Sequence, residues 1–147
     1  MKFLDTGHLF NDEILLDLER AMDADASRGY VPAYFFRICL PDGTHIGECD
    51  LRIGHNESTY YGGNTGYRVF APYRGHHYAE KASRLLFTFA KEHGLDHLII
   101  TCNPDNFPSR RTCERLGGTL LEIAELPEDN EMALEGETHK CIFRYEL

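Results

Sequence analysis

The chain has 147 residues, of which 42% are hydrophobic, and it carries a formal net charge of −9 at pH 7. This length supports a single domain, residues 1–147, with its own hydrophobic core, and it is too short for two ordinary domains. The negative charge argues against nonspecific nucleic-acid binding or an anionic membrane surface as the main partner. No signal peptide opens the chain and no apolar run approaches the ~20 residues of a membrane span, which predicts a soluble, cytoplasmic protein.

The cysteines and histidines form no recognisable disulfide or metal pattern. The five cysteines are an odd number without CxxC spacing, which predicts reduced, buried thiols. The eight histidines are scattered, apart from the adjacent pair His76 and His77. Because adjacent residues at a helix start point in different directions, we expect no metal site.

The first thirty residues are the least regular part of the sequence. Residues 13–22 have the composition of a helix, but Ile14, Leu16 and Leu18 alternate as they would in a strand. We predict a strand. The polar stretch 23–32 contains a glycine and a proline, and should be a connection or a single helical turn.

A β-hairpin is predicted next. Residues 33–40 and 45–53 have the pattern of strands, and the sequence Pro-Asp-Gly-Thr between them is a turn. One face of the return strand is predicted to carry Ile46, Glu48, Asp50 and Arg52. That face is either exposed to solvent or forms the polar wall of a binding pocket, and both interpretations stay open.

The longest helix of the chain is predicted directly after the following strand. Residues 54–60 should form a turn, and residues 61–70 a strand whose three glycines indicate a bulge or the close approach of a ligand. A turn at Arg74 and Gly75 then leads into an amphipathic helix over 78–93, which has apolar residues at helical spacing.

The start of this helix is a candidate anion site. The first turn of a helix leaves N–H groups without intrahelical partners, and the helix dipole adds partial positive charge there. Arg74, Lys81 and Arg84 add full positive charge to the same end. The sequence matches neither GxGxxG nor the P-loop pattern, so a tight turn beside a solvated charged face is the alternative interpretation.

The remainder alternates strands with loops and one short helix. We predict a buried strand over 97–102, a loop and short helix over 103–117, a strand over 120–126, an acidic loop over 127–137 and a final strand over 138–147. Asn106 is a candidate helix cap, and Pro108 fits the first turn of the short helix.

Two of these segments form a pair of motifs. Residues 74–79 read Arg-Gly-His-His-Tyr-Ala, and the segment 103–117 contains, in order, Asn103, Asn106, Ser109, Glu114 and Gly117. The first resembles the pyrophosphate loop, and the second the other acetyl-CoA motif, of the GCN5-related N-acetyltransferase (GNAT) superfamily. The likeness is strongest to the ribosomal-protein N-terminal acetyltransferase-like branch and covers about residues 33–147. His77 stands where the family usually has glycine.

The resemblance implies an α+β fold with a GNAT-like mixed, mostly antiparallel central sheet of six or seven strands and flanking helices. The two helices that the family places between its first two strands must be reduced, because there is hardly room for one. Acetyl-CoA is the implied co-substrate, with its pyrophosphate on the N–H groups between Gly75 and Ala79, and with pantetheine inserted where two central strands splay apart. The residues implied to bind it are Val69, Phe70, Arg74, Gly75, His76, His77, Tyr78, Ala79, Asn103, Asn106 and Arg110.

Acyl transfer from a thioester to an amine needs the two reactants held together, a route for the amine proton and a donor for the departing thiolate. In the resembled family the usual donor is a tyrosine on the short helix, but the aligned position here is Cys113, so Ser109 is the implied substitute. Glu48 is the predicted base, with Asp50, His55 and a water as alternatives. We expect proximity and water-relayed proton transfer to dominate.

The predicted function is therefore an acetyl-CoA-dependent N-acetyltransferase that acetylates a primary amine by direct attack in a ternary complex. We expect the acceptor to be a small molecule or a peptide N-terminus that carries positive charge, and a homodimer is left open. The alternatives are a non-catalytic acyl-CoA-binding sensor and an interaction domain that binds no cofactor.

Overall fold

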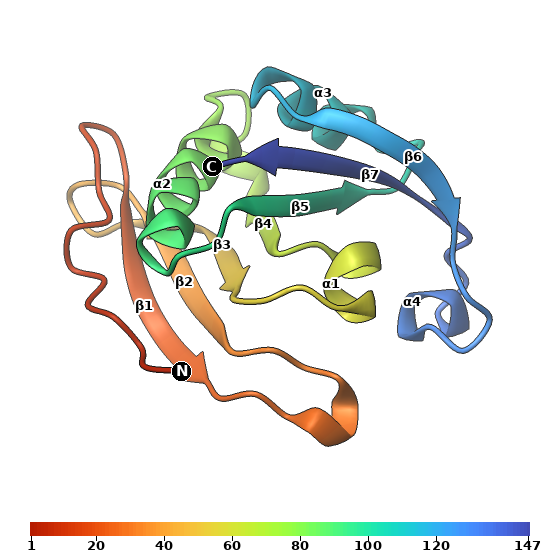
Figure 1. The fold of residues 1–147 in the computed structure, drawn as a ribbon. Helices are drawn as coiled ribbons and strands as arrows, with labels where there is room; N and C mark the ends of the chain where they lie inside the picture. Colours follow the sequence, from red (N-terminus) through yellow and green to blue (C-terminus); the bar gives the residue numbers. More distant parts are fainter.

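The computed structural model describes every residue from Met1 to Leu147 and contains two antiparallel sheets whose strands β4 and β5 lie side by side (Figure 1). The first sheet has the order β1-β2-β3-β4 and the second the order β5-β7-β6. The strands are β1 (Leu15–Met22), β2 (Ala33–Cys39), β3 (His45–Arg52), β4 (Thr65–Val69), β5 (His97–Cys102), β6 (Thr119–Glu125) and β7 (His139–Glu146). The helices are α1 (Glu57–Gly62), α2 (Tyr78–Glu92), α3 (Phe107–Arg115) and α4 (Glu131–Leu134), with 3-10 turns η1 (Ala26–Arg28) and η2 (Ala71–Tyr73).

This architecture confirms the predicted α+β fold with seven mostly antiparallel strands. The strand predicted over residues 13–22 is β1, and it pairs with β2 along its length. The connection from β1 to β2 holds nothing longer than the 3-10 turn η1, so the N-terminal helices are reduced as expected. None of the helices has the length and apolar character needed to cross a membrane.

The two sheets are joined by Asn64, which is fully buried immediately before β4. Its N–H donates to the Ile99 carbonyl at 2.6 Å, and its side-chain oxygen accepts the Ile99 N–H at 2.9 Å. Its amide nitrogen donates to the carbonyls of Arg52 and Gly54 at 3.0 and 2.8 Å. Asn64 thus fastens β3 and β5 to the start of β4, and the sheets separate beyond this point because no ladder joins β4 to β5.

The main core lies between the sheets and α2. The helical spacing predicted for α2 is confirmed, because Leu86 and Phe89 are completely buried while Arg84 is exposed. Phe89 packs edge-on against Tyr34 of β2, with ring centroids 4.9 Å apart. α3 contacts α2, whereas Tyr60 and Tyr61 of α1 pack on a separate small cluster around Ile99 and Ile142. One face of the first sheet is therefore covered by α2, and its other face carries the charged side chains of β3.

Two segments predicted to be irregular contain short helices. α1 occupies residues predicted to be a turn and the start of a strand, so β4 begins at Thr65 and not at Tyr61. The cause is a reciprocal capping box, in which Asn56 accepts the Thr59 N–H at 3.0 Å and the Thr59 hydroxyl accepts the Asn56 N–H at 2.9 Å. In the acidic loop, Asn130 caps α4.

The prediction that Ile46 shares the polar face of β3 with Glu48 and Asp50 is wrong. Cys39 pairs with His45, whereas Ile38 pairs with Gly47, so Ile46 is the extra residue of a β-bulge. The bulge turns Ile46 into the core, where it is completely buried. The prediction for the thiols is confirmed, because all five cysteines are free and buried.

We predict that Asn64→Ala lowers the free energy of unfolding by about 3 kcal/mol, because two carbonyls and one N–H lose their buried partner. Urea unfolding followed by circular dichroism measures this loss. The control is Asn130→Ala, which removes a half-buried helix cap and should cost about 1 kcal/mol. Equal losses in the two variants would contradict a special role for Asn64.

Candidate functional site

The N-terminal end of α2 has no cap. The first intrahelical bond runs from the Lys81 N–H to the His77 carbonyl at 3.1 Å, and no side chain accepts a hydrogen bond from the first turn. The N–H groups of Tyr78, Ala79 and Glu80 are therefore open. By contrast, α1, α3 and α4 are each capped by an asparagine. The longest helix thus offers both free donors and its dipole to an anion.

The turn before α2 is left-handed at two positions. Gly75 has φ 92° and His77 has φ 61°, and His77 is the only non-glycine residue of the chain with positive φ. A left-handed conformation costs a residue with a β-carbon about 1–2 kcal/mol. The backbone therefore keeps the shape that glycine favours at position 77 although a histidine occupies it.

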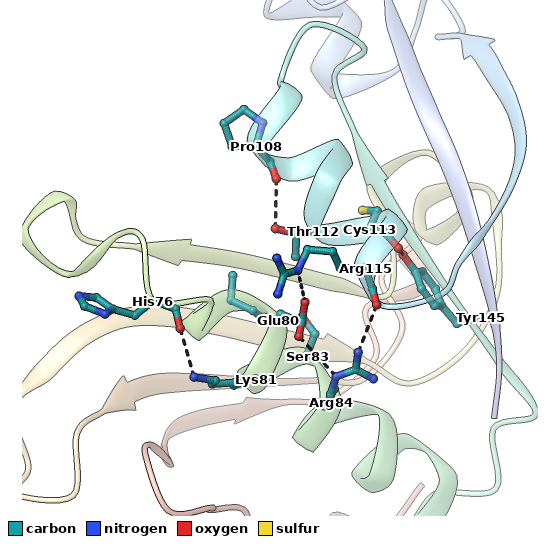
Figure 2. A network of polar contacts seen from close by, with 11 residues as sticks. His76, Glu80, Lys81, Ser83, Arg84, Pro108, Thr112, Cys113, Arg115 and Tyr145 are labelled. Carbon is teal, nitrogen blue, oxygen red and sulfur yellow. Dashed lines mark hydrogen bonds and ion pairs between the residues drawn. The ribbon is translucent and has the colours of Figure 1, made fainter.

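Two of the predicted cations near this turn are engaged by carboxylates. Lys81 forms an ion pair with Glu13. Glu80 binds Arg84 at 3.7 Å and Arg115 at 2.7 Å, which links α2 to the end of α3 (Figure 2). The hydrogen bond from Arg115 holds the pKa of Glu80 below its ordinary value. Lys81 and Arg84 are thus partly neutralised at the helix start.

The two arginines predicted to bind the cofactor, Arg74 and Arg110, form no ion pair with a carboxylate. Arg74 is exposed, and its Nε donates to the Val69 carbonyl at 2.9 Å. Arg110 donates to the Pro104 carbonyl at 3.1 Å. Hydrogen bonds to single carbonyls orient both guanidinium groups and leave several of their N–H donors for another acceptor.

The backbone N–H and carbonyl groups of alternate residues in β4 point to opposite edges of the strand. Asn64 and Phe70 bond to β3, so by the two-residue period of a strand the backbone groups of Tyr67 and Val69 point to the gap beside β5. Both backbone groups of Phe70 already have partners, and its predicted contact with pantetheine stays a prediction. Its N–H donates to the Ile46 carbonyl at 2.8 Å, and its carbonyl accepts from the N–H of residue 73 at 2.9 Å.

The loop before α3 contains an unsatisfied acceptor. The amide nitrogen of Asn103 donates to Glu137 at 2.9 Å, but the Asn103 side-chain oxygen is buried and has no partner. Such a group costs roughly 1–3 kcal/mol unless a ligand supplies a donor. Asn106 is exposed and caps α3 by accepting the Ser109 N–H at 3.3 Å, so it has a structural role of its own.

The hydroxyl of Ser109 lies 3.0 Å from the phenol of Tyr67 on β4. Burial raises the pKa of this phenol above its ordinary value. Cys113, one turn further along α3, is completely buried, and its carbonyl accepts the Tyr145 phenol at 2.7 Å (Figure 2). Sequence reasoning missed Tyr67, because a tyrosine within a strand carries no signal that it contacts a helix forty residues later.

The two predicted catalytic residues are not brought together. Ser109 and Tyr67 lie on the face of the sheet that α2 and α3 cover. Glu48 lies on the opposite face, where it pairs with Arg68 at 3.2 Å. Because neighbouring residues of a strand point to opposite sides, β4 itself separates Tyr67 from Arg68 and hence Ser109 from Glu48.

Asp50 is the more perturbed carboxylate on that opposite face. One of its oxygens accepts from Arg52 at 2.6 Å and from the Gly66 N–H of β4 at 3.0 Å. Burial raises the pKa of Asp50, and the charge of Arg52 opposes that rise. A carboxylate that binds the backbone of β4 and is desolvated has the environment of a candidate proton acceptor.

Two cavities lie on the uncovered face of the first sheet. The smaller has a volume of about 370 Å³ and contains Glu48, Asp50 and Arg68. The larger, about 660 Å³, lies between η1, α1 and the segment that leads into α4. Both are lined by Arg20 and Phe35, so they adjoin each other. The charged residues of the larger cavity are Arg20, Asp23, Arg28, Arg52, Glu57, Asp129 and Glu131.

One histidine pair lies near an aspartate at the start of β5. Ligand atoms of His55, Asp96 and His97 lie within 4.8 Å of one another. The imidazole rings of His55 and His97 stack in parallel at 3.8 Å. His55 already bonds to the His97 carbonyl, and His97 to Asp96. One nitrogen of each ring thus already has a hydrogen-bond partner, and the expectation of no metal stays a prediction.

Comparison with known proteins agrees with the fold. The acetyltransferase (GNAT) domain model matches residues 7–119. The chain belongs to this family. The match begins well before residue 33, where the sequence resemblance was expected to start. No curated protein matches the chain.

Several solved structures share this GNAT fold. Microcin C7 self immunity acetyltransferase MccE, in complex with acetyl-CoA and AMP, has a TM-score of 0.63 and 24% identity, and the match covers 78% of this chain and 61% of that one. A putative ribosomal-protein-serine acetyltransferase from Vibrio cholerae has a TM-score of 0.61 and 23% identity over 83% of this chain and 67% of that one. RimL, a ribosomal L7/L12 alpha-N-protein acetyltransferase in complex with coenzyme A, has a TM-score of 0.60 and 19% identity over 82% and 64%. The matched region thus spans 61% of the length of MccE.

We predict that His77→Gly raises the free energy of unfolding by about 1 kcal/mol, because glycine adopts the left-handed conformation without strain. Thermal and urea unfolding measure the change. The matched control is the neighbouring variant His76→Gly, which should be neutral or destabilising because His76 does not have positive φ. A loss of stability in His77→Gly would show that the imidazole stabilises the turn.

Proposed function

We propose that this chain is an N-acetyltransferase that uses acetyl-CoA and acetylates a primary amine by direct attack in a ternary complex. The observation that carries the proposal is the uncapped start of α2 beside the gap between β4 and β5, in a chain of the GNAT family. The MccE structure contains acetyl-CoA and the RimL structure contains coenzyme A, which supports acetyl-CoA as the co-substrate.

The residues around the gap suit the parts of acetyl-CoA. The pyrophosphate would accept hydrogen bonds from the N–H groups at Gly75–Ala79, with positive charge from Arg74 and Arg110. The pantetheine would pair with the backbone of Val69 across the gap. The unpaired oxygen of Asn103 would accept an amide N–H of pantetheine. His76, His77 and Tyr78 would line the phosphate turn, and Asn106 would hold the loop in place.

The transfer requires few groups. The amine nitrogen attacks the acetyl carbonyl carbon, the C–S bond breaks, and the amine gives up a proton while the sulfur gains one. Ser109, whose hydroxyl lies 3.0 Å from the phenol of Tyr67 on β4, would donate a hydrogen bond to the departing sulfur. Glu48 or Asp50 would accept the amine proton from the uncovered face, through water, and the geometry favours Asp50 because it binds the backbone of β4.

The acceptor would enter through the larger cavity on the uncovered face. Its four carboxylates exceed its three arginines. Two of these arginines are already paired, Arg28 with Asp25 at 3.8 Å and Arg52 with Asp50 at 2.6 Å. The third, Arg20, lies over the Phe35 ring at 4.5 Å. The cavity would therefore favour a cationic amine, either a small molecule or a peptide N-terminus.

We expect calorimetric titration to show that acetyl-CoA binds the chain and that Arg74→Ala with Gly75→Pro weakens binding at least tenfold, because charge and open donors are lost. Radiolabelled acetyl transfer to polyamines, aminoglycosides, amino acids and short peptides then tests turnover. Arg37→Ala is the control, because Arg37 lies on β2 among Asp17 and Glu19 and should leave affinity unchanged. Binding without transfer would support the non-catalytic sensor, and absence of binding would refute the proposal.

A second prediction concerns pH. If Asp50 is the base, kcat/KM should rise with pH through an apparent pKa above the ordinary aspartate value, because burial raises the pKa of Asp50 and only the ionised form accepts a proton. Asp50→Asn should lower kcat/KM about 100-fold and remove this rise. Glu48→Gln is the comparison: if it removes the rise and Asp50→Asn does not, Glu48 is the base.

A further inference from the structure

The hydroxyls of Tyr67 and Ser109 form a hydrogen bond between β4 and α3. Their oxygens lie 3.0 Å apart, and the other polar side chains beside them are the weakly bonding thiols of Cys113, near Tyr67, and Cys102, near Ser109. Tyr67 belongs to β4 and Ser109 to the first turn of α3, so the pair spans the gap-facing side of the fold.

Ser109 differs from the other serine and threonine residues of α2 and α3. Ser83, Thr88 and Thr112 each donate to the carbonyl four residues earlier, which is the usual partner within a helix. The residue four positions before Ser109 is Asp105, which lies outside α3. Ser109 therefore has no such acceptor within the helix, and its hydroxyl turns to Tyr67 instead.

The surroundings of Tyr67 decide which hydroxyl donates. The titratable groups packed around the phenol are Cys113 of α3, Cys102 of β5 and Tyr145 of β7, and Tyr145 already donates to the Cys113 carbonyl. If Ser109 donated to Tyr67, the phenol hydrogen would face only thiols, which are weak acceptors. The favoured arrangement is that Tyr67 donates to Ser109, which leaves the Ser109 hydrogen free.

We propose that Tyr67 is a positioning residue that aims the Ser109 hydroxyl hydrogen at the sulfur of bound coenzyme A. The inference rests on the proposed function. When the C–N bond forms and the C–S bond breaks, the electron pair left on sulfur accepts this hydrogen bond, and the proton released by the amine reaches sulfur through water. Ser109 and Tyr67 remain protonated throughout, so neither needs to be regenerated.

The test measures the thiol pKa of bound coenzyme A from its ultraviolet thiolate absorbance, with the desulfo-coenzyme A complex as reference. A hydrogen-bond donor to sulfur favours the thiolate, so the acid dissociation constant should be about tenfold larger in the wild-type complex than in Tyr67→Phe or Ser109→Ala. The double variant should equal Ser109→Ala, because Tyr67 acts only through Ser109. Tyr145→Phe is the matched control. It removes a phenolic hydroxyl from the same cluster, but that hydroxyl is bonded to the Cys113 carbonyl and not to Ser109, so the thiol pKa of bound coenzyme A should be unchanged.

Turnover gives a second readout. Tyr67→Phe should lower kcat about tenfold with the KM for acetyl-CoA unchanged, because the contact strengthens only as the thiolate forms. Thermal unfolding checks that each variant is folded. Two outcomes would overturn this inference but not the proposed function. One is a Tyr67→Phe variant that binds coenzyme A with wild-type affinity and leaves its thiol pKa unaltered. The other is a double variant in which the changes of the two single variants multiply. Failure of the wild-type chain to bind coenzyme A would overturn the proposed function and this inference with it.

Discussion

The hydrogen bonds of Asn64 determine where the two sheets are joined and where they separate. They fasten β3 and β5 to the start of β4, and no pairing joins β4 to β5 beyond that point. Two sheets that are tied at one end and untied at the other leave unpaired backbone groups along an internal edge. Such an edge within a core is unfavourable unless something pairs with it, and this is the physical reason for proposing that a ligand binds there.

Several polar groups at the untied end lack the local hydrogen-bond partner that such groups usually have. α2 begins without a cap, Asn103 keeps a buried oxygen without a partner, and Ser109 lacks the carbonyl that the other helix hydroxyls use. By contrast, α1, α3 and α4 are each capped by an asparagine side chain. The open donors and acceptors therefore collect around one gap, which is the distribution expected when a ligand completes the hydrogen bonding.

The local charge depends on which cationic side chains form ion pairs with carboxylates as well as on where those side chains lie. A chain of net charge −9 holds Lys81 and Arg84 against carboxylates and leaves Arg74 without an ion pair beside the turn into α2. On the other side of the sheet, carboxylates outnumber arginines in the larger cavity. An anion at the helix start and a cation at the uncovered face would each meet the opposite charge, although the whole surface is acidic.

The sequence alone determined those features that depend on neighbours along the chain. The spacing of apolar residues predicted α2, the unbroken apolar run predicted β5, and the two motifs predicted the family. Helix α1 was missed although its signal is local, because Asn56 and Thr59 form a capping box that differs from the usual Ser/Thr and Glu pattern. The bulge that buries Ile46 depends on the register of two paired strands, which the alternation of one strand does not reveal.

Only the tertiary structure decided which side chains meet. The contact between Tyr67 and Ser109 joins residues 42 positions apart, and the side chain of Asn64 binds the Ile99 N–H 35 positions away. The separation of Glu48 from Ser109 likewise follows from the two faces of β4. Periodicity shows that a residue faces a core or a solvent side, but not which residue it meets there, because partners across a sheet or beneath a helix are set by packing of the whole chain.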